Sequence, residues 1–178
     1  MHNYQDLITL FNHCFLTTHN TQLIKGEGEP LYLPADAERP HNTLFFANGY
    51  FASALHECSH WLIAGEERRK LVDFGYWYVP DGRTASEQEL FFRAEVKPQA
   101  LEWILSVAAG YCFRVSSDNL NGSESDTYQF KQAIHNQVKK YCEQPLPERT
   151  AIFRRSLCDF YGSNPVLKFE DFNFELLD

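Results

Sequence analysis

Two histidines and a glutamate near position 58 have the types and spacing that metal chemistry requires. His56, Glu57 and His60 form the pattern His-Glu-x-x-His. Residues four apart on a helix share one face, with Cβ atoms about 5–6 Å apart, so the two imidazoles can converge on one ion. The alternative is two ordinary histidines on a helix that faces a core, because Leu55 and Leu62 flank them. We favour the metal site, since imidazole is rarely buried without a polar partner.

Two imidazoles do not complete a site, so a third ligand must come from elsewhere in the chain. No histidine occurs between His60 and His135, which excludes a third histidine close to the motif. The other common ligand is a carboxylate from a following helix. The candidates are Glu87, Glu89, Glu95 and Glu102. The first two fall in a first helical turn, where acids are expected because of the helix dipole.

Glu95 is the candidate that we favour. It lies at helical spacing from Phe91 and Phe92, and a carboxylate on an apolar stripe is unfavourable unless a positive group pairs with it. Two alternatives stay open. Glu102 is a less favoured candidate ligand, because it lies one position off the next apolar stripe and suits a solvated edge. Glu95 would be structural if it pairs with an arginine such as Arg93 or Arg114.

The expected ligand set does not identify the metal. Two histidines and one carboxylate on one face of an octahedral ion leave positions open, which ferrous iron uses for dioxygen and substrate. Zinc would use the same ligands tetrahedrally with an activated water, and Glu57 would then be the general base. The ligands therefore allow an iron oxygenase or a zinc hydrolase.

The elements that must position these residues follow from hydrophobic periodicity and turn residues. Helices are predicted over 4–16, from 51 to 70, from 85 onward with a kink or a new start at Pro98, over 127–142 and over 148–160. Strands are predicted at 31–34, 43–46 and 73–79, while the polar, glycine-containing stretch 17–30 is assigned to a connection and 118–126 to a surface loop. The prediction is an α+β fold, one domain over 1–178, with helices packed around a small sheet.

Composition excludes several classes of protein. The chain has 178 residues, 44% hydrophobic and 15% aromatic, which excludes intrinsic disorder. Its net charge of −8 disfavours nonspecific binding to nucleic acid or to anionic membranes. Five cysteines without a CxxC pair suit reduced thiols, no apolar run is long enough to span a bilayer, and the first ten residues contain no Lys or Arg. We therefore expect a cytoplasmic protein without a signal peptide.

Three segments together resemble a known family. HECSHWLIAGEERR (56–69), DFGYWYVPDGR (73–83) and RAEVKPQALEW (93–103) are similar to the elongation factor P hydroxylase family, and the similarity extends over essentially the whole chain. The resemblance implies hydroxylation of the lysine of elongation factor P after β-lysine has been attached to it. It also implies a fold like that of small metal-dependent ribonucleases, dioxygen as cosubstrate, and Fe(II) held by His56, His60 and a glutamate that we place at Glu95.

The resemblance changes what the remaining residues are expected to do. An iron oxygenase needs no base for a hydrolytic water, so Glu57 would orient a ligand by a hydrogen bond. A β-lysylated lysine is cationic, and the charge of −8 suits it. Asp73 and Asp81, which flank the aromatic residues 76–78, are possible ammonium ligands, although ordinary strand packing is the favoured interpretation. The alternative function is a zinc-dependent peptidase or ribonuclease with Glu57 as base.

Overall fold

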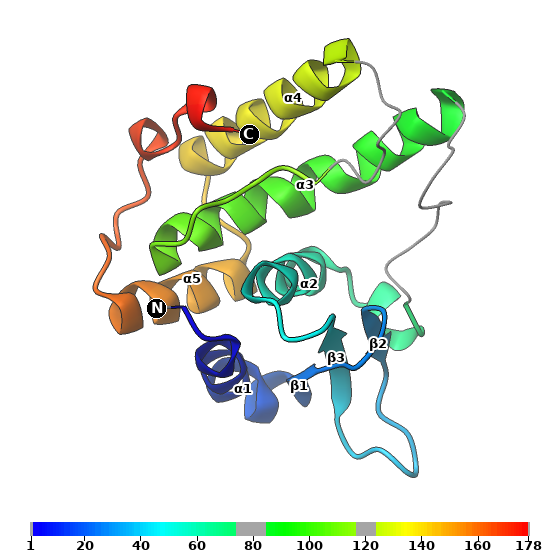
Figure 1. The fold of residues 1–178 in the computed structure, drawn as a ribbon. Coiled ribbons are helices and arrows are strands. Elements are labelled where there is room, and N and C mark those ends of the chain that lie inside the picture. Colours follow the sequence, from blue (N-terminus) through cyan, green and yellow to red (C-terminus); the bar gives the residue numbers. More distant parts are fainter. Residues whose placement is uncertain (1, 74–84, 117–123, 178) are drawn as a thin grey trace.

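The computed structural model describes residues 2–73, 85–116 and 124–177 (Figure 1). The helices are α1 (Tyr4–His19), α2 (Phe51–Ile63), α3 (Ala85–Ala109), α4 (Glu124–Glu143) and α5 (Glu148–Tyr161), with short 3-10 turns η1 (Arg68–Lys70), η2 (Phe169–Asp171) and η3 (Phe174–Leu176). The strands are β1 (Thr21–Lys25), β2 (Leu31–Leu33) and β3 (Asn42–Phe46). The chain is thus mostly helical with a small sheet, as expected. The likeness to metal-dependent ribonucleases stays a prediction.

The sheet is mixed, with strand order β1-β3-β2. β1 runs parallel to β3, pairing Leu23 with Leu44, and β2 runs antiparallel to β3. The two strands β2 and β3 confirm the prediction, but the assignment of 17–30 to a connection was wrong over β1. Only Thr21 and Leu23 of that strand are buried, and its sequence has a weak apolar pattern. The strand forms because it pairs with β3, about twenty residues later in the chain.

Helix α2 ends seven residues earlier than predicted. It stops at Ile63, and a turn leads into η1. The carbonyl of Ala64 does not continue the helical ladder, because it accepts hydrogen bonds from Arg149 Nη2 at 2.6 Å and Arg69 Nε at 3.3 Å. Gly65 follows, and glycine is a poor helix former. A side chain of α5 thus helps to end the helix that carries the histidines.

Helix α3 runs without interruption through Pro98, so the option of a new helix beginning there was wrong. A proline inside a helix removes the hydrogen bond to the carbonyl four residues earlier and its ring crowds that carbonyl, but α3 packs in the core both before Pro98, at Phe91, and after it, at Leu101. Helices α4 and α5 confirm the predictions, although α4 begins inside the segment predicted as a loop. Of the strand predicted at 73–79, only Asp73 is described; it forms an isolated bridge with Tyr32. Residues 74–79 and 118–123 lie outside the described residues.

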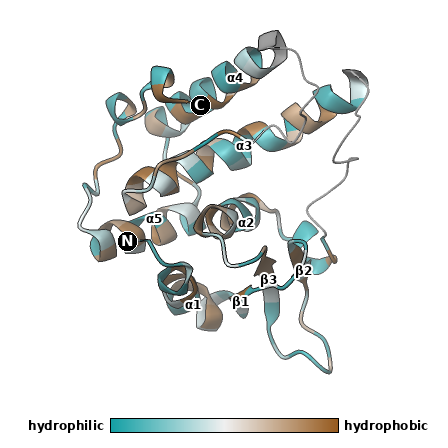
Figure 2. Cartoon of the chain, in the orientation of Figure 1, coloured by the Kyte–Doolittle hydropathy of each residue, from teal (hydrophilic) through white to brown (hydrophobic). Residues whose placement is uncertain are grey.

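Buried side chains form two clusters that share α3. The first core cluster joins α1, the sheet, α2, α5 and the last turn of α3, and its aromatic residues include Phe11, Phe15, Trp61 and Phe153. The second core cluster joins most of α3 to α4 and the C-terminal segment, with Phe91, Trp103, Phe130 and Phe172. Figure 1 shows α2 lying between α1 and α3, and Figure 2 shows how hydrophobic and hydrophilic residues alternate around these helices.

Two further expectations can be compared with the structure. All five cysteines are free in the structure, and reduced thiols remain the expectation. Within residues 2–73, 85–116 and 124–177, no helix combines the length and the apolar character that crossing a membrane requires.

Candidate metal centre

Helix α2 presents both histidines of the motif to α3. Their spacing of four residues places them on one face, and the Nε2 atoms of His56 and His60 lie 3.1 Å apart. The neighbouring residues Leu55 and Leu62 are buried in the first core cluster and fix the rotation of the helix. About a quarter of each imidazole remains exposed, so the pair lies at the border of the core.

Helix α3 brings Glu95 to the two imidazoles. Glu95 Oε2 lies 3.5 Å from His56 Nε2, and Oε1 lies 3.3 Å from His60 Nε2. The carboxylate is only 2% exposed. Within the described part of the chain, these three residues are the one group of His, Cys, Asp or Glu whose ligand atoms converge as at a metal ion, all within 4.8 Å of one another.

The separations among these atoms fit a bound divalent cation. Nitrogen and oxygen ligands sit about 2.0–2.2 Å from such an ion, so neighbouring ligand atoms are about 3.0–3.5 Å apart. The distances of 3.1, 3.3 and 3.5 Å agree with this spacing. The donor set of two neutral imidazoles and one carboxylate suits iron or zinc equally well.

Glu102 lies behind His56 and away from the converging atoms. Its Oε2 is 2.8 Å from His56 Nδ1, and the residue is 6% exposed. The expectation of a solvated edge was therefore wrong, and Glu102 is not with the three converging residues. The sequence contained a signal for this, because Glu95 and Glu102 are seven residues apart and two helical turns bring them to one face. A carboxylate on the second ring nitrogen fixes which nitrogen faces a metal.

The carboxylates make this site strongly attractive to positive charge. Burial alone lowers the pKa of His56, but the hydrogen bond to Glu102 and the charges of Glu102, Glu95 and Glu57 outweigh it and raise that pKa to about 10. A proton on His56 therefore offsets the buried acids when no metal is bound. A divalent cation can take over that role, with release of the proton.

Glu57 lies beside the converging atoms and is 8% exposed. No described residue donates a hydrogen bond to the Glu57 carboxylate. The hydrogen bond that orients a histidine was expected to involve Glu57, but it is Glu102 that accepts one from His56 Nδ1. Burial raises the pKa of Glu57, the two imidazoles oppose that shift, and the charges of Glu95 and Glu102 add to it. The Glu57 carboxylate is therefore available to accept hydrogen bonds from a ligand.

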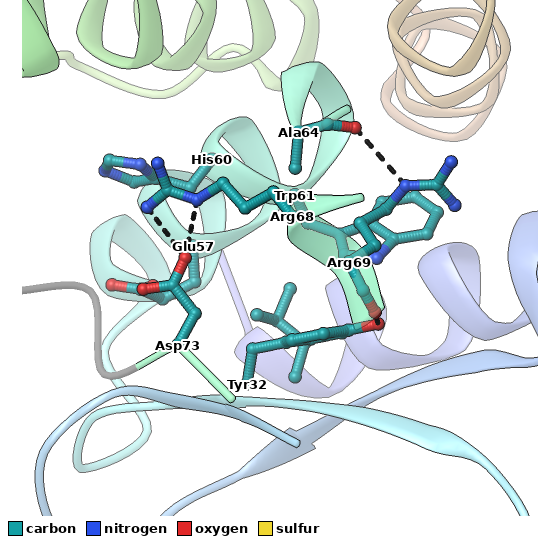
Figure 3. A pocket seen from close by; sticks show the side chains of 9 residues that line it. Tyr32, Glu57, His60, Trp61, Ala64, Arg68, Arg69 and Asp73 are labelled. Atoms are coloured by element: carbon teal, nitrogen blue, oxygen red, sulfur yellow. Dashed lines mark hydrogen bonds and ion pairs between the residues drawn. The ribbon is translucent and has the colours of Figure 1, made fainter. Parts of the chain in front are cut away.

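A pocket adjoins the site at His60 (Figure 3). The described residues that line it are Tyr32, Leu44, Glu57, His60, Trp61, Ala64, Arg68, Arg69 and Asp73. At its rim, Arg68 Nη2 lies 2.7 Å from Asp73 Oδ2. The other acid and the aromatic residues considered as ammonium ligands, Asp81 and 76–78, lie outside the described residues.

The remaining acidic candidates lie away from the histidines. Glu89 Oε1 lies 2.6 Å from Arg93 Nη2, and both side chains are well exposed. Glu87 is half-buried in the first turn of α3, two helical turns before Glu95. The geometry thus separates Glu95 from the other acids of α3.

Comparison with known proteins identifies the family. Residues 10–172 match the family described as elongation factor P hydroxylase. The chain is also 52% identical over 172 residues to a protein of Haemophilus influenzae named elongation factor P lysine hydroxylase, and the alignment covers 97% of each chain. With nearly the whole length matched on both counts, this chain belongs to the elongation factor P hydroxylase family.

Proposed function

We propose that this protein hydroxylates a lysine side chain of elongation factor P at a metal bound by His56, His60 and Glu95. The observation that carries the proposal is the convergence of these three side chains from two helices, within 4.8 Å, in a chain of this family. The name of the Haemophilus influenzae relative supports both the reaction and the protein substrate.

The metal that we propose is Fe(II). Two imidazoles and one carboxylate leave positions open on an octahedral ion, and ferrous iron in such a set supplies the dioxygen chemistry that inserts an oxygen atom into a C–H bond. Zinc would fit the same side chains but does not change its oxidation state. The reaction class of the family therefore favours iron over zinc.

The side chains of the chain itself have distinct tasks in this proposal. Glu102 accepts a hydrogen bond from His56 Nδ1–H, which leaves Nε2 with a lone pair directed at the metal position. Glu95 is almost fully buried, so water competes poorly with its two oxygens. His60 is the residue of the three that also lines the neighbouring pocket, so substrate enters on its side.

The proposed form of the substrate is the lysine that carries β-lysine. This group is cationic, and the acids around His56 together with the net charge of −8 attract cations. An unmodified lysine is shorter and carries one positive charge fewer. We therefore expect the modified protein to be the preferred substrate, and we expect neither nucleic acid nor membrane as a partner.

The test is an oxygen-incorporation experiment. Protein loaded anaerobically with Fe(II) is mixed with β-lysylated elongation factor P and a chemical reductant, exposed to air, and the intact mass of the substrate is measured. A gain of one oxygen atom is expected with β-lysylated substrate, and none with zinc-loaded protein. An iron-containing protein that adds no oxygen under these conditions contradicts the proposal.

One observation favours a second candidate, a zinc-dependent hydrolase. Glu57 is a buried carboxylate next to His60, which is where a base that activates a metal-bound water would be needed. This function predicts that zinc-loaded protein cleaves peptide or RNA and that Glu57→Gln stops cleavage while metal is retained. Hydrolysis by the zinc form without oxygen incorporation by the iron form would favour it.

A further inference from the structure

The pocket beside the metal centre contains a buried carboxyl group to which no described residue donates a hydrogen bond. Glu57 is more than nine-tenths buried, lines the pocket, and receives no hydrogen bond from any described residue. The other two buried acids nearby differ, because Glu95 faces both imidazoles and Glu102 binds His56 Nδ1. A buried carboxylate without a donor is unfavourable, so a ligand that brings positive charge and N–H groups would relieve that cost.

The rim of the same pocket already accommodates a cation. Arg68 forms an ion pair with Asp73, and Figure 3 shows its guanidinium between the His60 ring and the Asp73 carboxylate. Asp73 is 22% exposed, so a ligand that enters from solvent can reach it. The two acids thus lie along one path, with Asp73 at the rim and Glu57 deeper.

The aromatic residues of the pocket do not explain cation binding by themselves. The ring of Trp61 already has a cationic partner, because the guanidinium of Arg149 lies 4.6 Å from its centroid. Tyr32 directs its hydroxyl to the carbonyl of Arg69 at 2.9 Å. These rings therefore line the pocket, and the carboxylates are the groups that can bind a cation.

We propose that this pocket binds a primary ammonium group of the substrate, with Glu57 as its main carboxylate ligand and Asp73 as a second ligand at the rim. This inference rests on the proposed function. A β-lysyl group joined through its carboxyl keeps two free amines, both protonated near neutral pH. An ammonium held beside His60 sets how far the modified side chain extends past the metal, so Glu57 determines specificity rather than supplying a base.

The test is binding without turnover. Zinc-loaded protein is titrated calorimetrically with a peptide whose single lysine carries β-lysine, and with the same peptide after acetylation of both β-lysyl amines. Glu57→Gln is expected to weaken binding of the charged peptide about tenfold or more, because a charge-assisted hydrogen bond is lost, and to leave the acetylated peptide unaffected. The matched control is Glu67→Gln, which removes the same charge from a residue that is 87% exposed and does not line the pocket; less than a twofold change is expected.

Three results would overturn the assignment. They are a wild-type protein that binds both peptides equally, a Glu57→Gln protein within twofold of wild type on the charged peptide, and a loss of affinity that accompanies loss of zinc, which would place Glu57 in the metal centre. If Glu57→Gln does not fold, Asp73→Asn serves instead, and it should weaken the charged peptide about threefold. An unchanged affinity for Asp73→Asn then overturns the assignment.

The outcome is separable from that of the proposed function. In one outcome, iron-loaded wild type adds oxygen to elongation factor P, and Glu57→Gln binds the charged peptide normally. The proposed function then stands and the pocket assignment is wrong. In the other outcome, wild type binds the charged peptide through Glu57 but adds no oxygen. The pocket assignment then stands and the proposed function is wrong.

Discussion

The two core clusters contribute differently to the metal centre. The first core cluster holds α2, with its two histidines, between α1, the sheet and α5. The second core cluster holds the part of α3 that carries Glu95 and Glu102, and its other walls are α4 and the C-terminal segment. The positions of the imidazoles therefore depend on the packing of the first core cluster, and the positions of the carboxylates depend on the packing of the second.

Helix α3 connects the two clusters. Its residues from Phe91 to Ile104 pack in the second core cluster, whereas Leu105, Ala108 and Ala109 pack in the first. A single rigid helix that is fixed in both clusters sets the distance between the acids and the imidazoles. The geometry of the site therefore depends on how the two core clusters pack against each other through α3.

The largest expected effect is on folding. Phe11→Ala should lower the free energy of unfolding by about 3–5 kcal/mol, because Phe11 is fully buried and its ring contacts Phe15, Trp61 and Phe153. Urea denaturation followed by tryptophan fluorescence and circular dichroism measures it. Because α3 belongs to both clusters, the two probes should report one transition; separate transitions would show that the clusters unfold independently.

Its control lies on α5. Phe160 is 54% exposed, and Phe160→Ala should change the free energy of unfolding by less than about 0.5 kcal/mol.

Removing one ligand from either cluster should abolish the site equally. His60→Ala on α2 and Glu95→Ala on α3 are each expected to weaken metal binding more than about a hundredfold, because each leaves only two converging ligands. Metal content after dialysis and titration with Co(II) give the measurement. A Glu95→Ala protein that retains full metal content would remove α3 from the site.

Glu102 should have a smaller effect than a ligand. Glu102→Ala is expected to weaken metal binding about 10–100-fold, the range for partners that orient a metal-bound histidine. Glu102→Gln keeps an acceptor for His56 Nδ1 and should recover part of the loss. Glu89→Gln, an exposed acid on the same helix, is the control and should bind metal normally. Equal losses in the Ala and Gln variants would mean that charge rather than orientation is what Glu102 provides.

The smallest effect concerns the end of α3 that enters the first core cluster. Ser163 Oγ donates a hydrogen bond of 2.6 Å to the carbonyl of Ala108. Ser163→Ala should therefore lower the free energy of unfolding by about 1 kcal/mol and leave metal affinity within twofold. Thermal unfolding with and without Co(II) tests both statements. A large loss of metal affinity would indicate that α3 is less firmly fixed than its packing implies.

The helices and the histidine pair could be predicted because their signals are local. The spacing of four between His56 and His60 and the apolar periodicity of α1, α4 and α5 are contained in short windows of sequence. Glu95 also followed from a local rule, since an acid on an apolar stripe requires a partner. That the partner is a metal remains a prediction.

The features that were missed depend on residues far apart in the chain. β1 forms because it pairs with β3, and its own sequence is mostly polar. The end of α2 depends on Arg149, which lies 85 residues after Ala64. Glu102 was misjudged because its spacing of seven from Glu95 shows only that the two acids share a face of α3. The packing of α2 on that face, which buries Glu102, does not follow from the spacing.

The constellation uses few parts of the molecule. Helix α2 supplies His56 and His60, which are four residues apart. Helix α3 supplies Glu95 and Glu102, which are seven residues apart and face these histidines. Neither the sheet nor any connecting segment contributes an atom to this set. All four side chains come from α2 and α3, so transferring these donors to another scaffold requires that it hold two helices in the same relation.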